Sequence, residues 1–373
     1  MRNIIESTRA FEAWMRKRTD VSKRLLKRKH SKMRDGAFPF LRATFYRWAE
    51  QWPEVCPALA GRDQDVVLAV GDLHVENFGV WRDSREQLVW GVNDFDEACE
   101  LPFTSDLVRL AASIMLAAEK AHVTVPADRV CSLVLGGYRA GLRRGGAPIL
   151  LSDNPRSALV KLTKDTQEDP KAFWKKKLGE EDNPKIDAGD LPKGVEEMLR
   201  ASFRPRAELA FREQKAPGGL GSLGRRRYTA VEMSRGRVRE AREVKALVPS
   251  AEYWRAGRRD MLSQTATLLQ HAIRDPDPHF QVHDSWLVRQ LAPDIAKIEM
   301  PEDAADKRLA LAPDLLTLMG KETANVHLGS RSPGELEKLL QGLDRDKRWF
   351  AQATERMTEC TRDDHAKWAK ETS

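Results

Sequence analysis

The feature that most constrains this chain is a run of strand and turn signals at residues 71–98, GDLHVENFGVWRDSREQLVWGVNDFDEA. An apolar run, DVVLAVGD, leads into it and predicts a buried strand that ends in a turn. The segments FGVW and QLVWGV flank the polar RDSRE and predict a β-hairpin. Asp72 and Asn77 follow the buried strand, and Asp94 follows the hairpin. We therefore expect these three polar side chains to form a cluster.

This set of acid and amide side chains suits phosphoryl transfer. The reaction requires a carboxylate that orients the acceptor hydroxyl, and oxygen ligands that hold Mg²⁺ against the phosphates. We expect Asp72 to position or deprotonate the hydroxyl. Asn77 and Asp94 would hold Mg²⁺, with help from Asp96. Because Asp and Asn are common in loops, where they form local turns, a purely structural loop is the alternative.

These residues also carry a family resemblance. GDLHVEN resembles the catalytic loop of the aminoglycoside phosphotransferase and choline kinase branch of the protein-kinase-like fold. VNDFDEACELPFTSDLVRLAASI resembles the metal-binding segment of that branch and the helix after it, including Asp106 and Leu107. More closely, GDLHVENFG, NDFDEA and DLVRLAAS together are similar to an uncharacterised bacterial family, a domain of unknown function. The resemblance is densest at 71–113; it implies a kinase-like fold and does not give a substrate.

A glycine-rich turn and a strand lysine, which kinases place before the catalytic loop, come after it in this chain. Gly219, Gly221 and Gly224 form G-x-G-x-x-G with Ser222 inside it, and glycines let a backbone approach phosphate closely. The motif enters the strand RRYTAVEM rather than a helix, so a Rossmann site fits badly. A hairpin follows, and Lys245 late in its second strand would bind the phosphates of ATP. A lone glycine motif is a weak signal, and a solvated strand lysine is the alternative for Lys245.

Two further parts of a kinase have candidates. Kinases pair the strand lysine with a glutamate, for which Glu252 on the next helix and Glu243 on the lysine's own strand are the options. SWLVRQLAP resembles the strand that leads to the hinge between the lobes, where adenine would lie. Arg289 in this segment is a cofactor-binding candidate. An exposed strand end is the alternative.

The order of these motifs implies a circular permutation. LMGKETANVHLGSR, residues 318–331, resembles the G-x-x-L-A-x-x-H helix that precedes the catalytic loop in aminoglycoside phosphotransferases, with Thr323 in place of the usual Leu. Joining the two ends of the sequence on paper restores the kinase order of glycine-rich loop, lysine, hinge, helix, catalytic loop and metal-binding Asp. Permutation is tolerated where chain ends lie close together on a surface.

We therefore predict an α+β fold: a protein-kinase-like two-lobe fold, circularly permuted, with a mostly helical large lobe and a small antiparallel β-rich lobe. The predicted divisions are an N-terminal helical segment (1–60), the catalytic-loop and metal-binding part of the helical lobe (61–205), the β-rich nucleotide-binding lobe (206–300) and C-terminal helices that complete the helical lobe (301–373). Periodicity predicts helices over 4–30, 127–145 and 251–273 and within 303–370. It also predicts a helix that begins near residue 105, with Ser105 as its N-cap.

Arg42 and two histidines are further candidates for the site. FPFLRA at 38–43 matches an aromatic–Arg motif of the uncharacterised family, with Ala43 where Gly is usual. The guanidinium of Arg42 could bind the transferred phosphate, or could tie the N-terminal helix to the core. His74 and His327 are expected near the active site. A lone histidine is more often a packing or hydrogen-bonding residue than a catalyst, and His74 is not expected to be the base.

Charge leaves the acceptor and the partners open. The formal net charge is +7, and ten Lys or Arg fall within residues 16–34, which form either a solvated basic helix or a surface for nucleic acid or another polyanion. Glu76, Glu97 and Glu100 would favour a cationic acceptor, or are exposed loop charges. The rivals to a phosphotransferase are a nucleotide-binding regulator with little turnover, an AMP-transferring enzyme and a nucleic-acid-binding protein. The oligomeric state is not predicted.

Composition indicates the compartment. Four scattered cysteines without a CxxC pair indicate free thiols in a reducing cytosol and argue against a zinc site. The first fourteen residues carry charges and lack the apolar core of a signal peptide. The longest apolar stretch, LAASIMLAA at 110–118, is far shorter than the roughly 20 residues that span a membrane. We expect a cytoplasmic protein without membrane contact.

Overall fold

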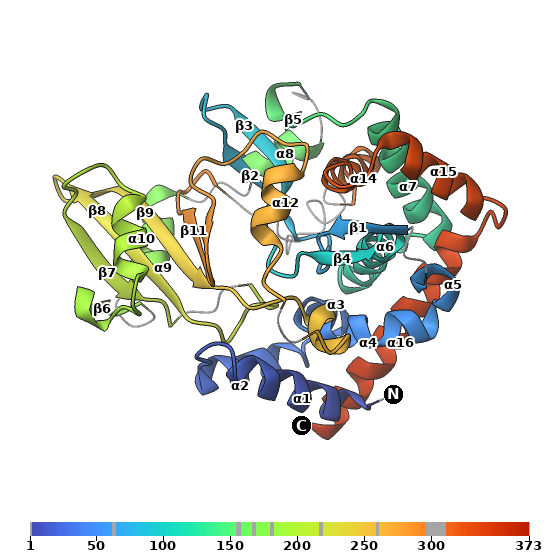
Figure 1. The fold of residues 1–373 in the computed structure, drawn as a ribbon, viewed down its shortest axis with the longest axis horizontal. Helices are drawn as coiled ribbons and strands as arrows, with labels where there is room; N and C mark the ends of the chain where they lie inside the picture. The colour runs from blue at the N-terminus through green and yellow to red at the C-terminus, as the bar shows by residue number, and fades with distance from the viewer. Residues whose placement is uncertain are drawn as a thin grey trace.

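The computed structural model shows a mixed α+β fold, which confirms the predicted class. The residues that it describes are 2–61, 65–153, 158–165, 169–179, 183–215, 219–258, 261–295 and 311–372. A long twisted sheet forms one end of the molecule, and most helices pack together at the other end (Figure 1). The segments that contain Asp72 and Asp94 lie in the helical part.

Within the described residues, the long sheet has six strands, and all neighbouring strands are antiparallel. In spatial order they are β10 (Gln281–His283), β11 (Trp286–Gln290), β9 (Arg237–Ala246), β8 (Arg227–Ser234), β7 (Leu209–Glu213) and β6 (Lys185–Ile186). Val244 packs in an apolar cluster with Tyr228, Val288 and Leu199 of α10 (Val195–Ala201). Because side chains alternate along a strand, Lys245 points to the opposite face, toward the helical part. The predicted β8–β9 hairpin is confirmed, and β10 and β11 form a second antiparallel pair.

Two smaller antiparallel sheets position the polar motifs. One pairs β1 (Val66–Ala69) with β4 (Cys99–Pro102). The other joins β2 (Phe78–Arg82), β3 (Leu88–Val92) and β5 (Ile149–Leu150). The buried strand and the hairpin predicted around residues 65–92 are therefore confirmed. Asp72 follows the end of β1, Asn77 directly precedes β2, and Asp94 follows β3.

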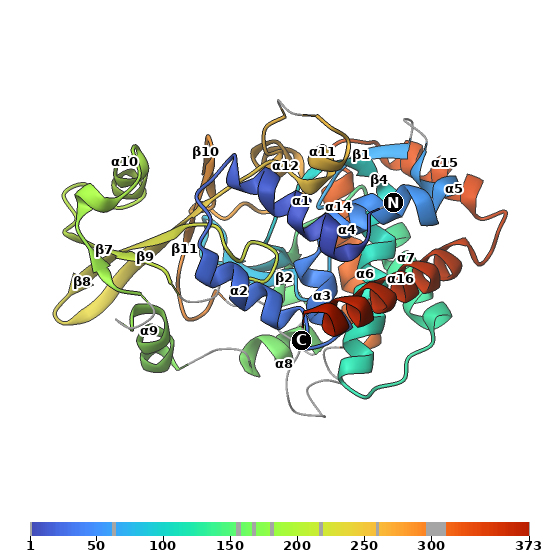
Figure 2. The same ribbon diagram turned by 90° about the horizontal axis from the view of Figure 1, so that it is seen from below.

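Besides α10, the described α-helices are α1 (Ile4–Arg16), α2 (Lys23–Lys32), α3 (Ala37–Ala43), α4 (Phe45–Val55), α5 (Pro57–Ala60), α6 (Phe103–Lys120), α7 (Ala127–Arg143), α8 (Ala158–Asp165), α9 (Pro170–Leu178), α11 (Ala251–Arg255), α12 (Thr265–His271), α14 (Pro313–His327), α15 (Pro333–Leu343) and α16 (Trp349–Glu371). The last helix, α16, packs against the N-terminal helices α1, α3 and α4. Figure 2 shows α16 beside the N-terminal helices. Buried Arg47 of α4 pairs with buried Asp364 of α16, and Gln51 donates to the same carboxylate at 2.9 Å. One continuous apolar core joins these helices, except α9, to β1–β4.

A buried hydrogen-bond chain fixes the backbone between β1 and Asp72. The Asp106 carboxylate accepts from the backbone N–H of Val70 at 2.7 Å and of Gly71 at 3.0 Å. His327 at the end of α14 contacts the same carboxylate at 3.2 Å and bonds to the Tyr138 hydroxyl at 3.0 Å. Gly71 has φ +79, and a Cβ there would lie 2.3 Å from the Glu97 carbonyl oxygen, so only glycine fits. His327 is thus a structural partner of the turn.

Several predicted helices differ from those observed. The segment 4–30 contains two helices, since residues 17–22 leave helical geometry and Val21 forms a β-bridge with Arg225. The predicted helix at 251–273 is two short helices, α11 and α12. Ser105 is not the cap of α6, which begins after Pro102; its buried hydroxyl accepts from the Trp48 indole at 3.3 Å. Among the described residues, no helix combines the length and apolar character needed to span a membrane.

Candidate active site

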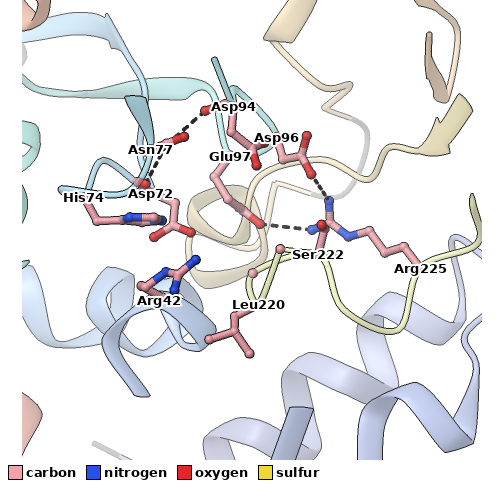
Figure 3. Close-up of a pocket in the computed structure, with 12 residues that line it drawn as sticks. Arg42, Asp72, His74, Asn77, Asp94, Asp96, Glu97, Leu220, Ser222 and Arg225 are labelled. Atoms are coloured by element: carbon pink, nitrogen blue, oxygen red, sulfur yellow. Dashed lines mark hydrogen bonds and ion pairs between the residues drawn. The ribbon is translucent and has the colours of Figure 1, made fainter. Parts of the chain in front are cut away.

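A pocket between the sheet and the helical part collects most of the predicted site residues (Figure 3). Its lining residues are Arg42, Asp72, His74, Asn77, Asp94, Asp96, Glu97, Gly219, Leu220, Gly221, Ser222 and Arg225. Nine of the twelve predicted residues are among them; Gly224, Lys245 and Arg289 are not in the lining. The free volume is about 30 Å³, enough for about two water molecules.

Asp72 is held by an arginine that the sequence did not single out. Both Nε, at 3.1 Å, and Nη2 of Arg109 donate to the Asp72 Oδ1 atom. The other oxygen, Oδ2, lies under the glycine-rich turn, where a Cβ on Gly221 would be 3.0 Å away. Burial raises the pKa of Asp72 to about 7, although Arg109 favours the charged form and opposes the rise. The carboxylate therefore titrates near neutral pH.

Asn77 presents an oxygen to the pocket because its amide nitrogen is committed elsewhere. Nδ2 donates to the backbone oxygens of Asp72 at 2.9 Å and of Asp94 at 3.1 Å. These two bonds orient the amide, and Oδ1 is buried with no hydrogen-bond partner among the described residues. An orphaned buried oxygen is costly unless a ligand satisfies it. Asn77 Oδ1 is thus a suitable cation ligand.

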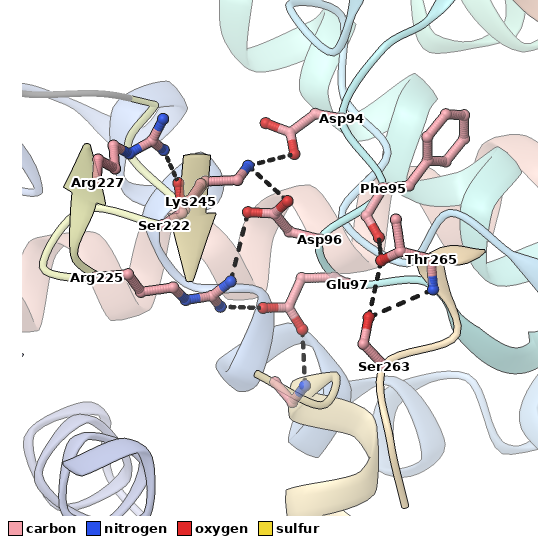
Figure 4. Close-up of polar contacts among 12 residues, drawn as sticks. Asp94, Phe95, Asp96, Glu97, Ser222, Arg225, Arg227, Lys245, Ser263 and Thr265 are labelled. Atoms are coloured by element: carbon pink, nitrogen blue, oxygen red, sulfur yellow. Dashed lines mark hydrogen bonds and ion pairs between the residues drawn. The ribbon is translucent and has the colours of Figure 1, made fainter. Parts of the chain in front are cut away.

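The NDFDEA segment faces the cations of the sheet end (Figure 4). Lys245 Nζ lies 2.6 Å from Asp96 Oδ1 and 3.5 Å from Asp94 Oδ1. Burial lowers the pKa of Lys245, and the two carboxylates oppose that effect. The sequence proposed Glu252 or Glu243 as the partner of this lysine. Glu252 instead pairs with Arg255, and Glu243 with Arg227 and Arg289, so the close carboxylate is Asp96.

The donor set fits Mg²⁺ only together with a substrate. Among the described residues, no three His, Cys, Asp or Glu side chains are arranged to hold a metal ion. Mg²⁺ is usually bound by one or two carboxylates together with waters and substrate phosphates, rather than by a complete protein cage. Asn77 Oδ1 and the Asp94 carboxylate meet this smaller requirement. The ammonium of Lys245 contacts Asp94 in this structure.

The glycine-rich turn is clamped by α2. Lys29 Nζ donates to the Gly221 carbonyl at 3.3 Å, and the Ser22 N–H donates to the Gly224 carbonyl at 2.9 Å. Ser222 accepts a hydrogen bond from Arg227 of β8. Gly224 has φ +114 and packs on Leu26 instead of lining the pocket. Burial lowers the pKa of Lys29 to about 8. The turn therefore closes the pocket over Asp72.

The other candidates have identifiable contacts. Arg42 lines the pocket and forms an ion pair with Glu76. Buried His74 lies beside Asp72 (Figure 3). Arg289 donates to Glu243 at 2.9 Å, on the sheet face that carries Lys245. The acidic set predicted to attract a cationic acceptor is already engaged. Its members are Glu76, paired with Arg42, Glu97, paired with Arg225, and the exposed Glu100, paired with Arg258.

Three cationic residues of the site were missed by sequence reasoning: Arg109, Arg225 and Lys29. Arg225 follows the glycine motif directly, and this adjacency could have indicated that it belongs to the site. Arg109 lies three residues after Asp106 in DLVRLAAS, a segment that the family resemblance had already marked. Lys29 gave no signal of its own among the ten cations of 16–34.

Comparison with known proteins gives one family match. Residues 21–186 match the model of a family described as an uncharacterized protein conserved in bacteria (DUF2252). Comparison with curated proteins and with solved structures gave no match. The predicted similarity to an uncharacterised bacterial family is confirmed over this segment, which contains Arg42, Asp72, Asn77 and Asp94. The segment ends before the glycine-rich turn.

Proposed function

We propose that this chain is an ATP- and Mg²⁺-dependent phosphotransferase that acts on a hydroxyl acceptor through a circularly permuted, protein-kinase-like fold. One observation carries the proposal: two distant segments of sequence meet at one pocket. Asp72, Asn77 and Asp94 come from the first third of the chain, and the turn Gly219–Ser222 comes from the second half. Lys245, which kinase order places after that turn, contacts Asp94.

The contacts suit a specific division of roles. Because Arg109 holds Asp72 Oδ1, the Oδ2 atom is the oxygen that accepts the proton of the acceptor hydroxyl. The hydroxyl oxygen bonds to the γ-phosphorus, the bond to the β-phosphate oxygen breaks, and ADP leaves. Mg²⁺ held by Asn77 and Asp94 would supply positive charge against the phosphates. Lys245 adds a further positive charge, so that positioning and electrostatics account for catalysis.

The glycine-rich turn must open for this reaction. A triphosphate does not fit in about 30 Å³ of free volume. The closed turn is held by the side-chain contact from Lys29, by the bond from Arg227 to Ser222, by the ion pairs of Arg225 and by backbone contacts of residues 21–22. Opening the turn must release part of this set. We infer that this structure is the closed form.

The position of α14 supports the permuted order. In the kinase-like reading, the helix at 318–331 directly precedes the catalytic loop. Its His327 contacts Asp106, which in turn holds the Val70 and Gly71 N–H groups just before Asp72. The end of this helix thus adjoins the loop in space, although about 250 residues separate them in sequence.

The alternatives make different predictions. A nucleotide-binding regulator would bind ATP without turnover, and an AMP-transferring enzyme would release pyrophosphate instead of ADP. A polyanion contact stays a prediction for residues 16–34, where α2 exposes Lys23, Arg24, Lys27 and Arg28 to solvent. Such binding would weaken steeply with salt.

The test is product analysis with ATP and Mg²⁺. The wild-type chain should form ADP, and Asp72→Asn should lower the rate by roughly 100-fold or more while keeping ATP affinity. Asp284→Asn, an exposed carboxylate in the β10–β11 turn, is the control and should keep full activity. Asp72→Asn with wild-type turnover would refute the catalytic role, and release of pyrophosphate instead of ADP would favour AMP transfer.

A further inference from the structure

Arg225 is a charged residue of the pocket to which the proposed function gives no role. Its side chain is 1% exposed and extends from the glycine-rich turn toward the NDFDEA segment (Figure 4). Nη1 lies 3.4 Å from Asp96 Oδ2, and Nη2 lies 3.1 Å from Glu97 Oε1. Its Nε is buried without a hydrogen-bond partner among the described residues. Burying a guanidinium with an unsatisfied N–H is costly, so a ligand that accepts from it would be stabilising.

A second cation meets the same carboxylate. Asp96 binds Arg225 through Oδ2 and Lys245 through Oδ1, the latter at 2.6 Å. Glu97 steadies the arginine, and its own Oε2 accepts from the Ala251 N–H at 2.7 Å. Both cations are therefore held in fixed positions, one on the glycine-rich turn and one on β9, at the side of the pocket where the proposed function places the donor phosphates.

We propose that Arg225 and Lys245 form a two-cation site for the phosphate tail of a nucleoside polyphosphate, and that Asp96 positions both cations instead of binding metal. The inference rests on the proposed function and assigns its donor-binding groups. A guanidinium donates two parallel hydrogen bonds to phosphate, and an ammonium adds a compact point charge. Asp96 is therefore the carboxylate partner of Lys245, the role predicted from the sequence for Glu252 or Glu243.

Binding of ATP to the full-length chain tests the two-cation site. Titration calorimetry with ATP is run once in EDTA and once with Mg²⁺. Arg225→Met should weaken ATP binding by about tenfold or more in both buffers, because it removes charge-assisted hydrogen bonds to phosphate. Arg226→Met is the matched control. Arg226 is partly exposed, pairs with Glu213 and does not line the pocket, so the affinity of this variant for ATP should stay within about twofold of wild type.

Asp96 is tested by its metal dependence. Asp96→Asn should weaken ATP binding in EDTA as well as with Mg²⁺, as expected when it loosens Lys245 and Arg225. Asp94→Asn should cause the larger loss when Mg²⁺ is present. A loss in Asp96→Asn confined to the Mg²⁺ buffer would overturn the positioning role and mark Asp96 as a metal ligand.

The remaining outcomes are also decisive. Wild-type affinity in a folded Arg225→Met variant would overturn the two-cation site and leave Arg225 as a tie between the turn and the NDFDEA segment. If Arg225→Met does not fold, Arg225→Lys decides: lower affinity supports the site, and unchanged affinity overturns it. A wild-type chain that binds no ATP would overturn the proposed function, and this inference with it.

Discussion

At the scale of single residues, the environment of Asp72 depends on Arg109. The guanidinium of Arg109 is 1% exposed and lies 5.2 Å from the Phe45 ring centroid and 5.0 Å from that of Trp48. It also donates to the Leu41 carbonyl at 2.8 Å. These contacts fix the guanidinium, which in turn fixes which oxygen of Asp72 faces the pocket.

Replacing Arg109 should therefore affect turnover more than donor binding. Arg109→Met is expected to lower kcat by roughly tenfold to a hundredfold with a much smaller change in the KM for ATP. Arg109→Lys keeps one charge and should recover part of the rate. Steady-state kinetics of variants with wild-type thermal unfolding measure this. An unchanged kcat in Arg109→Met would show that Asp72 needs no such support.

Glu322, which lies outside the pocket, should make the free energy of unfolding depend on pH. This buried side chain of α14 accepts from the Val92 N–H and from Asn325, and burial raises its pKa to about 7, against an ordinary value of 4.5. Between these values the folded state binds more protons than the unfolded state. The contribution of Glu322 to the free energy of unfolding is therefore present below about pH 4.5 and is lost as pH rises through 7, by about 3 kcal/mol.

Glu322→Gln should remove that loss. Urea unfolding of the variant and of wild type is compared at the two ends of this pH range, and the stability difference between the variant and wild type should shift in favour of the variant as pH rises. A parallel pH dependence in both proteins would mean that Glu322 titrates normally.

The residues that could be predicted from sequence share one property. Asp72, Asn77 and Asp94 each follow or precede a strand that is recognisable from its apolar run, so local structure alone brings them near one another. Arg109 and Arg225 carry no such spacing signal. Their contacts with Asp72 and Asp96 arise from tertiary packing between segments that are far apart in sequence. The same is true of the contact between Lys245 and Asp96, which takes the place of the predicted contact with Glu252 or Glu243.

At the scale of elements, α2 has two distinct faces. Its outer face exposes cations, and its inner face places Leu26 and Lys29 against the glycine-rich turn. Sequence periodicity located the basic helix but could not show that it covers the turn, because the partner lies about 190 residues away. The break at residues 17–22 has the same origin: the β-bridge of Val21 with Arg225 competes with helix continuation.

Loss of the Lys29 contact should loosen the turn. Lys29→Met removes a charge-assisted hydrogen bond to Gly221, and the backbone amides of residues 219–222 should exchange hydrogen about tenfold faster or more. Lys27→Met, at an exposed position of the same helix, is the matched control and should exchange like wild type. Equal exchange in both variants would show that the turn stays closed without the Lys29 contact.

At the scale of the whole molecule, composition and periodicity predicted the class but not the assembly. The α+β class, the hairpins and the C-terminal helices followed from local patterns. The joining of the first and last segments through Arg47 and Asp364, and the closure of the pocket by the turn, depend on contacts that no local pattern encodes. The resemblance of local motifs led to the kinase-like hypothesis, and the order of those motifs led to the hypothesis of a circular permutation. The arrangement of the motifs in space makes both hypotheses testable.

The central claim is that the two halves of one nucleotide site meet in this pocket, although their order along the chain is the reverse of that in kinases. A crystal structure of the full-length chain with a non-hydrolysable ATP analogue and Mg²⁺ tests it most directly. We expect the triphosphate between the opened turn Gly219–Ser222 and the side chains of Asp72 and Asp94, with Lys245 on the phosphates. A nucleotide bound elsewhere, or a pocket that stays closed under saturating analogue, would contradict it.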